Sequence, residues 1–334
     1  MKRAVLYVLC LFYILTIFCA CTSDPKKTAL KELERRKIPF TEQMFLGKAY
    51  EGDIGAITQF MAAGINREAR TVEDGYNALM IAAHAGHTEI LKLLLDSGMD
   101  VNAVDNTGVT ALMRAAVNGH THCARVLLEK GADANLKAEG QKGMTALMFA
   151  ATTGQTDVVR LLLEKGANPD IRSAEGNQAL MFAQLSGNPA TVALLTSAAS
   201  NVNTPNDKSI NALHIAIKRH EKEQAAMLIA KGANVNASDN TGFTPLMLAC
   251  QEGDAATAKL LLERGAVVNA TYMANGRSIT PLMIAAMKGH EAVVRLLKAN
   301  NVDTTAKDGQ GCDAAVYARH NGFEYIARVI EGRD

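Results

Sequence analysis

The chain has 334 residues and a formal net charge of +1, from 35 Lys and Arg against 34 Asp and Glu, with no Trp and 5% aromatic residues. Because a nucleic-acid surface needs clustered positive charge, and single-strand binding needs aromatic stacking platforms, this composition argues against both functions. The 48% of apolar residues, rich in Ala, Leu and Met, instead favours a helical protein.

The first segment has the layout of an export signal. Two basic residues precede an uncharged apolar run over residues 4–20, which is slightly shorter than the roughly 20 residues that span a bilayer. The run ends at Ala20, and Cys21, Thr22 and Ser23 follow. This boundary resembles a bacterial lipoprotein signal, in which a small residue precedes the cysteine that receives the acyl groups. The resemblance implies a signal peptide over residues 1–20 and lipidation of Cys21.

Other interpretations of the leader stay open. One is ordinary cleavage near Thr22, and another is an uncleaved membrane anchor. Six basic residues between positions 26 and 37 outnumber the two before the apolar run, and positive charge prefers the cytoplasmic side, so an anchor would leave the body in the cytoplasm. The lipoprotein resemblance instead implies the bacterial cell envelope, at the outer membrane or periplasmic face. A metal site at Cys19 and Cys21 is disfavoured because two thiolates would lie at hydrocarbon depth.

Residues 21–40 are charged and are expected to form a lipidated tether, or a short leading helix. One unit is then repeated through residues 41–334. Its leucine triplets stand at 78–80, 111–113, 146–148, 179–181, 212–214, 245–247 and 281–283. The central leucine therefore recurs every 33 to 36 residues. A period of this length is typical of a repeat architecture.

The units resemble ankyrin repeats. The clearest copies are DNTGVTALMRAAVNGHTHCARVLLEKGADAN, at 105–135, and DNTGFTPLMLACQEGDAATAKLLLERGAVVN, at 239–269. Both follow the family pattern of a T-P-L helix, a G-H turn, a second apolar helix and a G-A-D-x-N ending. The resemblance implies an all-α repeat solenoid in which each unit has a helix-turn-helix and a β-finger.

We expect about nine units including caps, because no single unit can bury its apolar face alone. The first is a divergent N-terminal cap and the last a degenerate C-terminal one. The predicted units are 41–71, 72–104, 105–137, 138–172, 173–205, 206–238, 239–271, 272–307 and 308–334.

The fingers carry the candidate binding positions. In the ankyrin family the fingers and the ends of the first helices form a concave binding face, so the resemblance makes this face the contact candidate. The residues predicted to contact a partner are Tyr76, Val109, Met144, Ile210, Phe243, Tyr272, Arg277 and Ile279. Two fingers, 138–144 and 270–279, are longer than the rest, and extra loop length on a solenoid often marks partner contacts. Arg114 stands where other units carry an apolar residue, so it either reaches an acidic neighbour or marks a polar spot in the groove.

Residue patterns for catalysis or metal binding are weak. Two His-Glu pairs, at 220–221 and 290–291, begin like a zinc-protease helix, but Gln224 and Val294 replace the required second His. Methionine replaces the family's T-P-L-H histidine in six units, and a repeated buried position favours core packing over a metal site. The three cysteines of the body, Cys123, Cys250 and Cys312, lie too far apart along a solenoid to form a disulfide.

The sequence therefore predicts a membrane-tethered ankyrin scaffold that binds an unknown protein partner through its concave face. We expect no catalysis, cofactor, metal, nucleic acid or small-molecule substrate. Two alternatives stay open. One is an uncleaved signal-anchor protein with a cytoplasmic scaffold, and the other is a metal or redox protein that uses the His and Met content.

Overall fold

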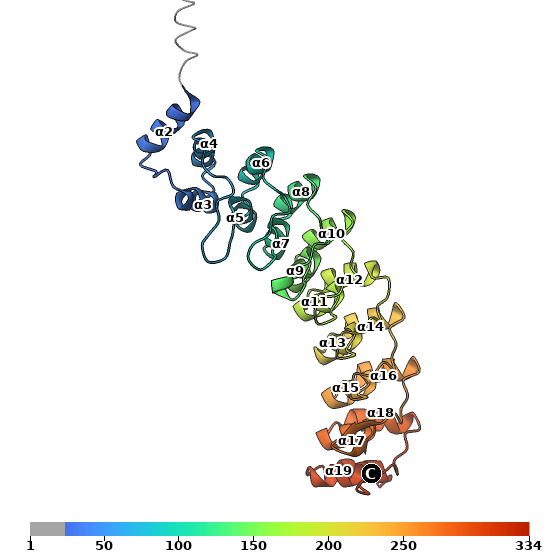
Figure 1. Cartoon of the computed structure of the whole chain (residues 1–334). Coiled ribbons are helices and arrows are strands. Elements are labelled where there is room, and N and C mark those ends of the chain that lie inside the picture. The colour runs from blue at the N-terminus through green and yellow to red at the C-terminus, as the bar shows by residue number, and fades with distance from the viewer. Residues whose placement is uncertain (1–23, 334) are drawn as a thin grey trace, which may run out of the picture. The chain divides into compact units, whose positions relative to one another are not determined.

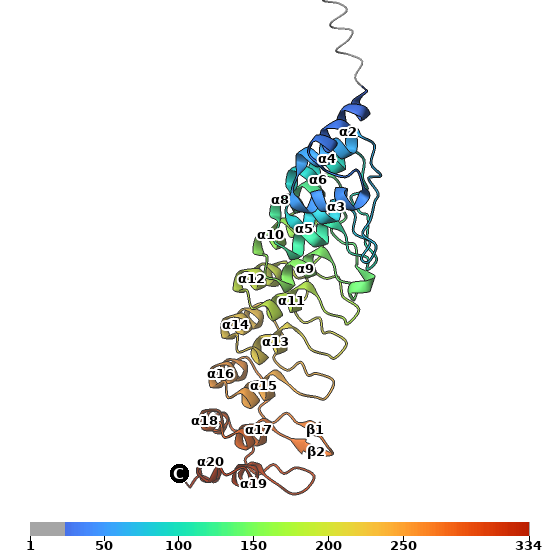
Figure 2. The same ribbon diagram turned by 90° about the vertical axis from the view of Figure 1, so that its left-hand side faces the viewer.

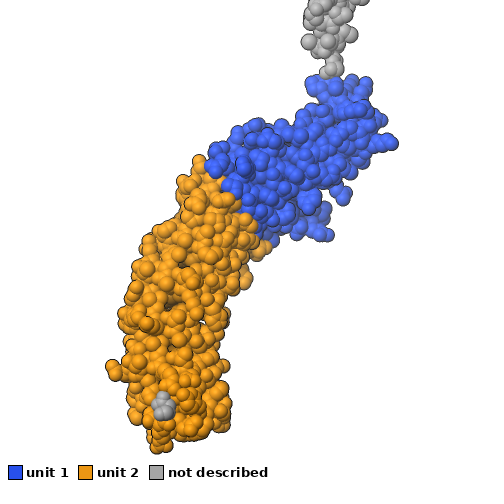
Figure 3. Space-filling view, turned by 180° about the vertical axis from the view of Figure 1, so that it is seen from behind, with its two compact units in different colours: residues 1–133 blue, residues 134–334 orange. Residues whose placement is uncertain are grey.

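A computed structural model describes residues 24–333, most of them in short helices joined by tight turns. Cys21, the predicted lipidation site, lies outside the described residues, as does the predicted signal peptide. The chain divides into two compact units, residues 1–133 and 134–334, here called the N-terminal unit and the C-terminal unit (Figure 3).

The N-terminal unit begins with a helix that packs on the first helix pair. This helix, α2 (Pro25–Arg35), starts with proline in its first turn, and Leu33 is one of its two buried residues. It packs on α4 (Ile54–Ala62), and Arg36 pairs with Asp53 at 2.5 Å. The interval 21–40 therefore contains the leading helix that was one of the two expected structures.

Three helix pairs make up the rest of the N-terminal unit. They are α3 (Glu42–Glu51) with α4, α5 (Ala78–Ala85) with α6 (Thr88–Asp96), and α7 (Ala111–Val117) with α8 (Thr121–Glu129). Within this unit the odd-numbered helices form one row and the even-numbered helices another (Figure 1). An extended loop, called a finger as in the sequence, precedes each odd-numbered helix from α5 onward.

The C-terminal unit continues the same plan with six pairs. They are α9 (Ala146–Thr152) with α10 (Thr156–Glu164), α11 (Ala179–Ser186) with α12 (Pro189–Ala198), α13 (Ala212–Lys218) with α14 (Lys222–Ala230), α15 (Pro245–Glu252) with α16 (Ala255–Glu263), α17 (Pro281–Lys288) with α18 (Glu291–Ala299), and α19 (Ala314–His320) with α20 (Glu324–Glu331). Its fingers project beside the odd-numbered row (Figure 2). Residues 24–333 thus contain nine helix pairs, which confirms the predicted all-α repeat solenoid.

The two longer fingers carry additional secondary structure. Residues Glu139–Gln141 form a 3-10 turn, and β1 (Tyr272–Ala274) pairs with β2 (Arg277–Ile279) as an antiparallel hairpin. In this hairpin Tyr272 lies opposite Ile279. The inserted residues therefore extend the finger without interrupting the helix pairs.

Most odd-numbered helices begin with a threonine cap, and a methionine follows three residues later. The Thr244 hydroxyl accepts the backbone N–H of Met247, and the Met247 sulfur in turn lies 3.5 Å from the Thr244 N–H. Asn211 and His214 make the corresponding pair in another unit, where His214 Nδ1 accepts the Asn211 N–H at 3.4 Å. The methionine that replaces the family's histidine is thus a core residue whose thioether also serves as a weak acceptor.

Where a repeat carries a G-H pair, its histidine joins that repeat to the one before it. In the N-terminal unit the His120 ring donates from Nε2 to the carbonyl oxygen of His84 at 2.9 Å, and a Cβ built on Gly86 would lie 2.8 Å from that ring. In the C-terminal unit His290 donates to Gln251 in the same way. Glycine is required at Gly86 because its φ of 80° is left-handed and because the histidine occupies the space of a side chain.

The asparagine that ends most repeats makes a second connection between neighbouring repeats. Asn236 accepts the N–H of Val267 and donates to the carbonyl oxygen of Gly265, both at 2.9 Å. Asn203 makes the equivalent pair with the next helix pair in the C-terminal unit. The structure shows that these side chains hold consecutive helix pairs in register.

One helix pair, α11 with α12, departs from the pattern in three places. Gln178 replaces the capping threonine and makes no side-chain cap to α11. Gln184 is fully buried where most other repeats carry Ala or Cys, and neither of its amide atoms has a hydrogen-bond partner among the described residues. Ala199 replaces the closing glycine, and the chain leaves α12 there in an extended conformation. This pair therefore lacks contacts that stabilise its neighbours.

Candidate functional site

Several fingers are each held in shape by one polar side chain at the start of the finger. The Asp105 carboxylate accepts the N–H groups of Thr107 and Val109 at 2.8 and 3.0 Å. Asp239 and Asp308 do the same for their own fingers. The finger backbone is thus fixed before any partner binds, which lowers the entropy lost on binding.

Neighbouring fingers are also tied together at their tips. In the N-terminal unit Asn106 donates from its backbone to the carbonyl oxygen of Asp74 and from its side chain to the carbonyl oxygen of Glu73, both at 3.0 Å. In the C-terminal unit Asn240 donates in the same manner to Lys208 and Asp207. The fingers that are joined in this way form a continuous edge within their unit.

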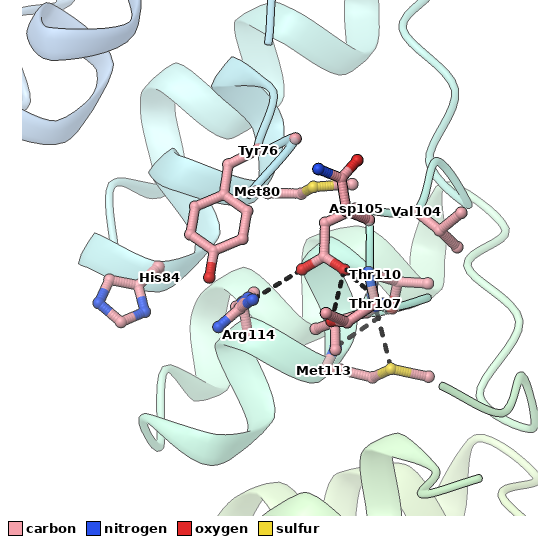
Figure 4. A network of polar contacts seen from close by, with 12 residues as sticks. Tyr76, Met80, His84, Val104, Asp105, Thr107, Thr110, Met113 and Arg114 are labelled. Atoms are coloured by element: carbon pink, nitrogen blue, oxygen red, sulfur yellow. Dashed lines mark hydrogen bonds and ion pairs between the residues drawn. The ribbon is translucent and has the colours of Figure 1, made fainter. Parts of the chain in front are cut away.

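Arg114 is the polar centre of this face in the N-terminal unit (Figure 4). Its Nη2 lies 2.7 Å from Asp105 Oδ2, and the Asp105 side chain is completely buried. Its guanidinium carbon lies 4.3 Å from the centroid of the Tyr76 ring, a cation–π contact. The acidic neighbour considered for Arg114 is therefore the aspartate of its own finger.

The electrostatics around this pair are consistent with a charged Asp105. Burial alone would raise the pKa of Asp105, but the hydrogen bonds from Arg114, Val109 and Thr107 lower it below its ordinary value. For His84, burial lowers the pKa, and the positive charge of Arg114 lowers it further. A neutral His84 ring can accept from Asn118, whose Nδ2 lies 3.0 Å from His84 Nδ1.

The last helix pair repeats this arrangement with a different side chain. Tyr317 occupies the place of Arg114 and donates its hydroxyl proton to Asp308 Oδ2 at 2.6 Å. Arg277, a predicted contact residue, is half-buried beside them, and its hydrogen bond with Tyr317 raises the pKa of the guanidinium. The contact between an odd-numbered helix and the aspartate of its finger thus recurs in two repeats. It was not recognised from the sequence because one repeat uses arginine and the other tyrosine.

The predicted contact residues fall into two groups by exposure. Tyr76, Met144, Ile210, Phe243, Tyr272 and Arg277 are half-buried and keep part of their surface accessible. Val109 and Ile279 are only 4% and 3% exposed, so their side chains are buried in the protein interior. Phe243 and Tyr272 meet edge to face with centroids 4.7 Å apart and form an aromatic pair on the C-terminal unit's finger edge.

The groups considered for metal or redox chemistry do not gather into a site within the described residues. No group of three or more potential ligands among His, Cys, Asp and Glu gathers within residues 24–333. Cys123 and Cys250 are buried, burial raises the pKa of both thiols, and Cys312 is half-buried. None of the helices in the described residues is long and apolar enough to cross a membrane.

These features define a helix-pair repeat protein with a preformed finger edge. Two family models agree with this class. The model described as ankyrin repeats (3 copies) matches residues 46–138, 136–206 and 199–272, and the model described as ankyrin repeats (many copies) matches 249–298. The chain belongs to the ankyrin-repeat family, whose members are typically scaffolds for protein–protein interaction. No curated protein matched the chain.

Proposed function

We propose that this protein is a membrane-tethered scaffold that binds another protein through its fingers and odd-numbered helices, without chemistry of its own. The observation that carries the proposal is the finger edge itself, which is fixed by its own aspartates and still presents half-buried aromatic and charged side chains. Rigid, partly buried aromatic and arginine side chains are the residue types that dominate protein–protein binding energies.

We propose that the protein has no catalytic activity because several side chains that could react are engaged in holding the repeats together. The ring nitrogens of His120 and His290 donate to carbonyl oxygens of the preceding helix pair, and Met247 and Met283 are buried at helix starts. Side chains committed to stacking the repeats are not free to act on a substrate.

A capture experiment tests the binding surface. The full chain, solubilised in a mild detergent, would be compared with a Phe243→Ala/Tyr272→Ala variant for the proteins it retains from its source cells. Loss of a retained protein is expected because the double change removes the aromatic pair. Tyr325→Ala removes an exposed aromatic ring on α20 and is the matched control. Equal capture by all three proteins would contradict the proposed surface.

The tether is proposed from the leader, in which Ala20 and Cys21 end the apolar run. We expect the mature protein to begin at a lipidated Cys21 and to sit at the outer membrane or periplasmic face of a bacterial envelope. Mass spectrometry of the mature N-terminus tests this, with Cys21→Ser as the control that should block the modification. An intact Met1 would instead identify an uncleaved anchor.

A further inference from the structure

A groove of about 760 Å³ opens in the N-terminal unit between α3 and the first finger, residues 70–76. Ile81 of α5 also lines it, so the groove lies on the finger and odd-numbered-helix face. A volume in the range of about 300–1,000 Å³ is typical of protein pockets that enclose a ligand. The groove is therefore large enough to take several side chains.

The groove presents apolar surface that the N-terminal unit leaves uncovered. Tyr50 on α3 is 61% exposed and Val72 on the finger is 98% exposed, while Leu46 lies buried between them and the core. A Cβ built on Gly47 would meet no atom within 4 Å. Uncovered apolar side chains beside open space mark a place where another apolar side chain can be buried.

The rim of the groove is acidic. Glu42 on α3 and Glu73 and Asp74 on the finger all line it, and none of the three forms an ion pair within the described part of the chain. The Glu42 carboxylate accepts one neutral hydrogen bond, from Asn66 at 2.8 Å. Three carboxylates thus stand at one groove without a compensating partner.

The one cation that lines the groove is already engaged. Arg70 donates from Nη1 to the carbonyl oxygens of Gly75 and Val104, at 2.9 and 2.6 Å. Three carboxylates against one guanidinium leave a net negative charge at the rim. Such a rim attracts cationic groups and repels acidic peptides and anionic lipid headgroups.

We propose that this groove docks a segment of a partner protein in which a leucine- or phenylalanine-sized side chain stands next to lysine or arginine. The apolar side chain would lie against Tyr50, Val72 and Ile81, and the cation would meet Glu73 and Asp74. This inference rests on the proposed scaffold function and assigns the chemistry of a partner to one part of the finger face.

Three fluorescent, end-blocked octapeptides test the proposal by polarisation with the full chain in a nonionic detergent. One alternates lysine and leucine, one glutamate and leucine, and one lysine and serine. The lysine–leucine peptide is expected to bind at least about tenfold more tightly than either of the others, because only it supplies both the apolar and the cationic contact. Its binding should weaken as salt is raised.

Two variants locate the binding. Gly47→Leu places a side chain beside α3 where a Cβ would meet no atom within 4 Å, and Glu73→Lys/Asp74→Lys reverses the rim charge at two exposed side chains. Both should reduce binding of the lysine–leucine peptide by about tenfold or more. Glu68→Lys/Glu129→Lys makes the same change in net charge at exposed positions outside the groove, and should leave binding unchanged.

Unchanged peptide binding by Gly47→Leu, or equal binding of the glutamate–leucine peptide, would overturn the proposal. Sedimentation of the full chain detects a different occupant, because a dimer that Gly47→Leu dissociates would assign the groove to a second copy of the chain and likewise overturn it. If both groove variants keep a captured partner that Phe243→Ala/Tyr272→Ala loses, the groove inference fails while the scaffold function stands.

Discussion

His214 is the one histidine at the position that methionine occupies in six other units, and it should make stability depend on pH. Burial lowers the pKa of His214, partly opposed by the charge of Asp239. The unfolded chain therefore takes up a proton at this residue before the folded chain does. The free energy of unfolding is expected to be undiminished above about pH 6.5 and to fall as the pH drops through that value.

Urea unfolding at pH 7.5 and at pH 5.5 measures this effect. His214→Met, which copies the other units, should lose less stability between the two pH values than the original chain. Met247→His makes the reverse change at the equivalent position and should lose more. Identical pH dependence in all three proteins would show that His214 is not the responsible group.

Gln184 should be a removable defect. Its fully buried amide has no partner among the described residues, and an unsatisfied buried polar group costs about 1–3 kcal/mol. Gln184→Met keeps a straight side chain of similar length and should raise the free energy of unfolding by about 1 kcal/mol or more. Gln224→Met is the matched control, because the Gln224 amide donates to Glu221 and only its oxygen lacks a partner among the described residues, so its loss should give a smaller gain. A less stable Gln184→Met protein would mean that the amide is satisfied.

Asn236 shows how one side chain connects two helix pairs. Asn236→Ala removes the acceptor for Val267 and the donor to Gly265, which should lower the free energy of unfolding by about 1–2 kcal/mol. Hydrogen exchange at the Val267 amide should accelerate at the same time. Asn234→Ala, at an exposed neighbour whose side chain accepts only a local turn bond, is the control and should cost less. Equal losses from the two changes would contradict the connecting role.

The leading helix α2 should stabilise the first helix pair. Leu33 is 1% exposed against α4, so Leu33→Ala should cost about 2–4 kcal/mol and increase hydrogen exchange in α3 and α4. Leu30→Ala, at a half-buried position of the same helix, should cost less. If Leu33→Ala leaves exchange in α4 unchanged, then α2 is a passive tether.

The helix pairs were predictable from the sequence because each repeats the same local signals. Thr244 caps its helix, Pro245 stands in the first turn, and Gly253 ends the helix in a left-handed conformation, each by a contact within a few residues. The positions of Val109 and Ile279 were less predictable. A finger residue can point into the core or outward, and only the paired strands or turns decide which.

The candidate site was predictable only in part, because its contacts join residues from different repeats. Tyr76 and Arg114 were each noticed, but their stacking depends on how one finger lies over the next odd-numbered helix. The acidic groove likewise combines α3 with a finger about 25 residues later, and no spacing rule in the repeat shows that Gly47 and Val72 line one groove.

At the scale of the molecule, the main contacts of each helix pair in residues 24–333 are with its sequence neighbours within the same unit. In the C-terminal unit α19 packs on α17, and α20 packs on α18. In such an array stability is the sum of repeat and neighbour terms, so damage should stay local.

Truncation tests this locality. Removing residues 308–334 takes away α19 and α20 and uncovers α17 and α18. We expect faster hydrogen exchange in α17 and α18, with protection of α13 and α14 retained. A global loss of protection would show instead that the C-terminal unit unfolds as one block.

The glycine–histidine contact also limits how such a chain can grow by duplication. Gly86 and Gly253 each leave room for a histidine of the following repeat, whereas Gly154 meets Asn188 and Gly289 meets Phe323. A copied repeat fits without adjustment only where its leading side chain matches the pocket of the glycine before it. At this contact the histidine-led repeats are therefore expected to be interchangeable, while those led by Asn188 and Phe323 place a different side chain against the glycine before them.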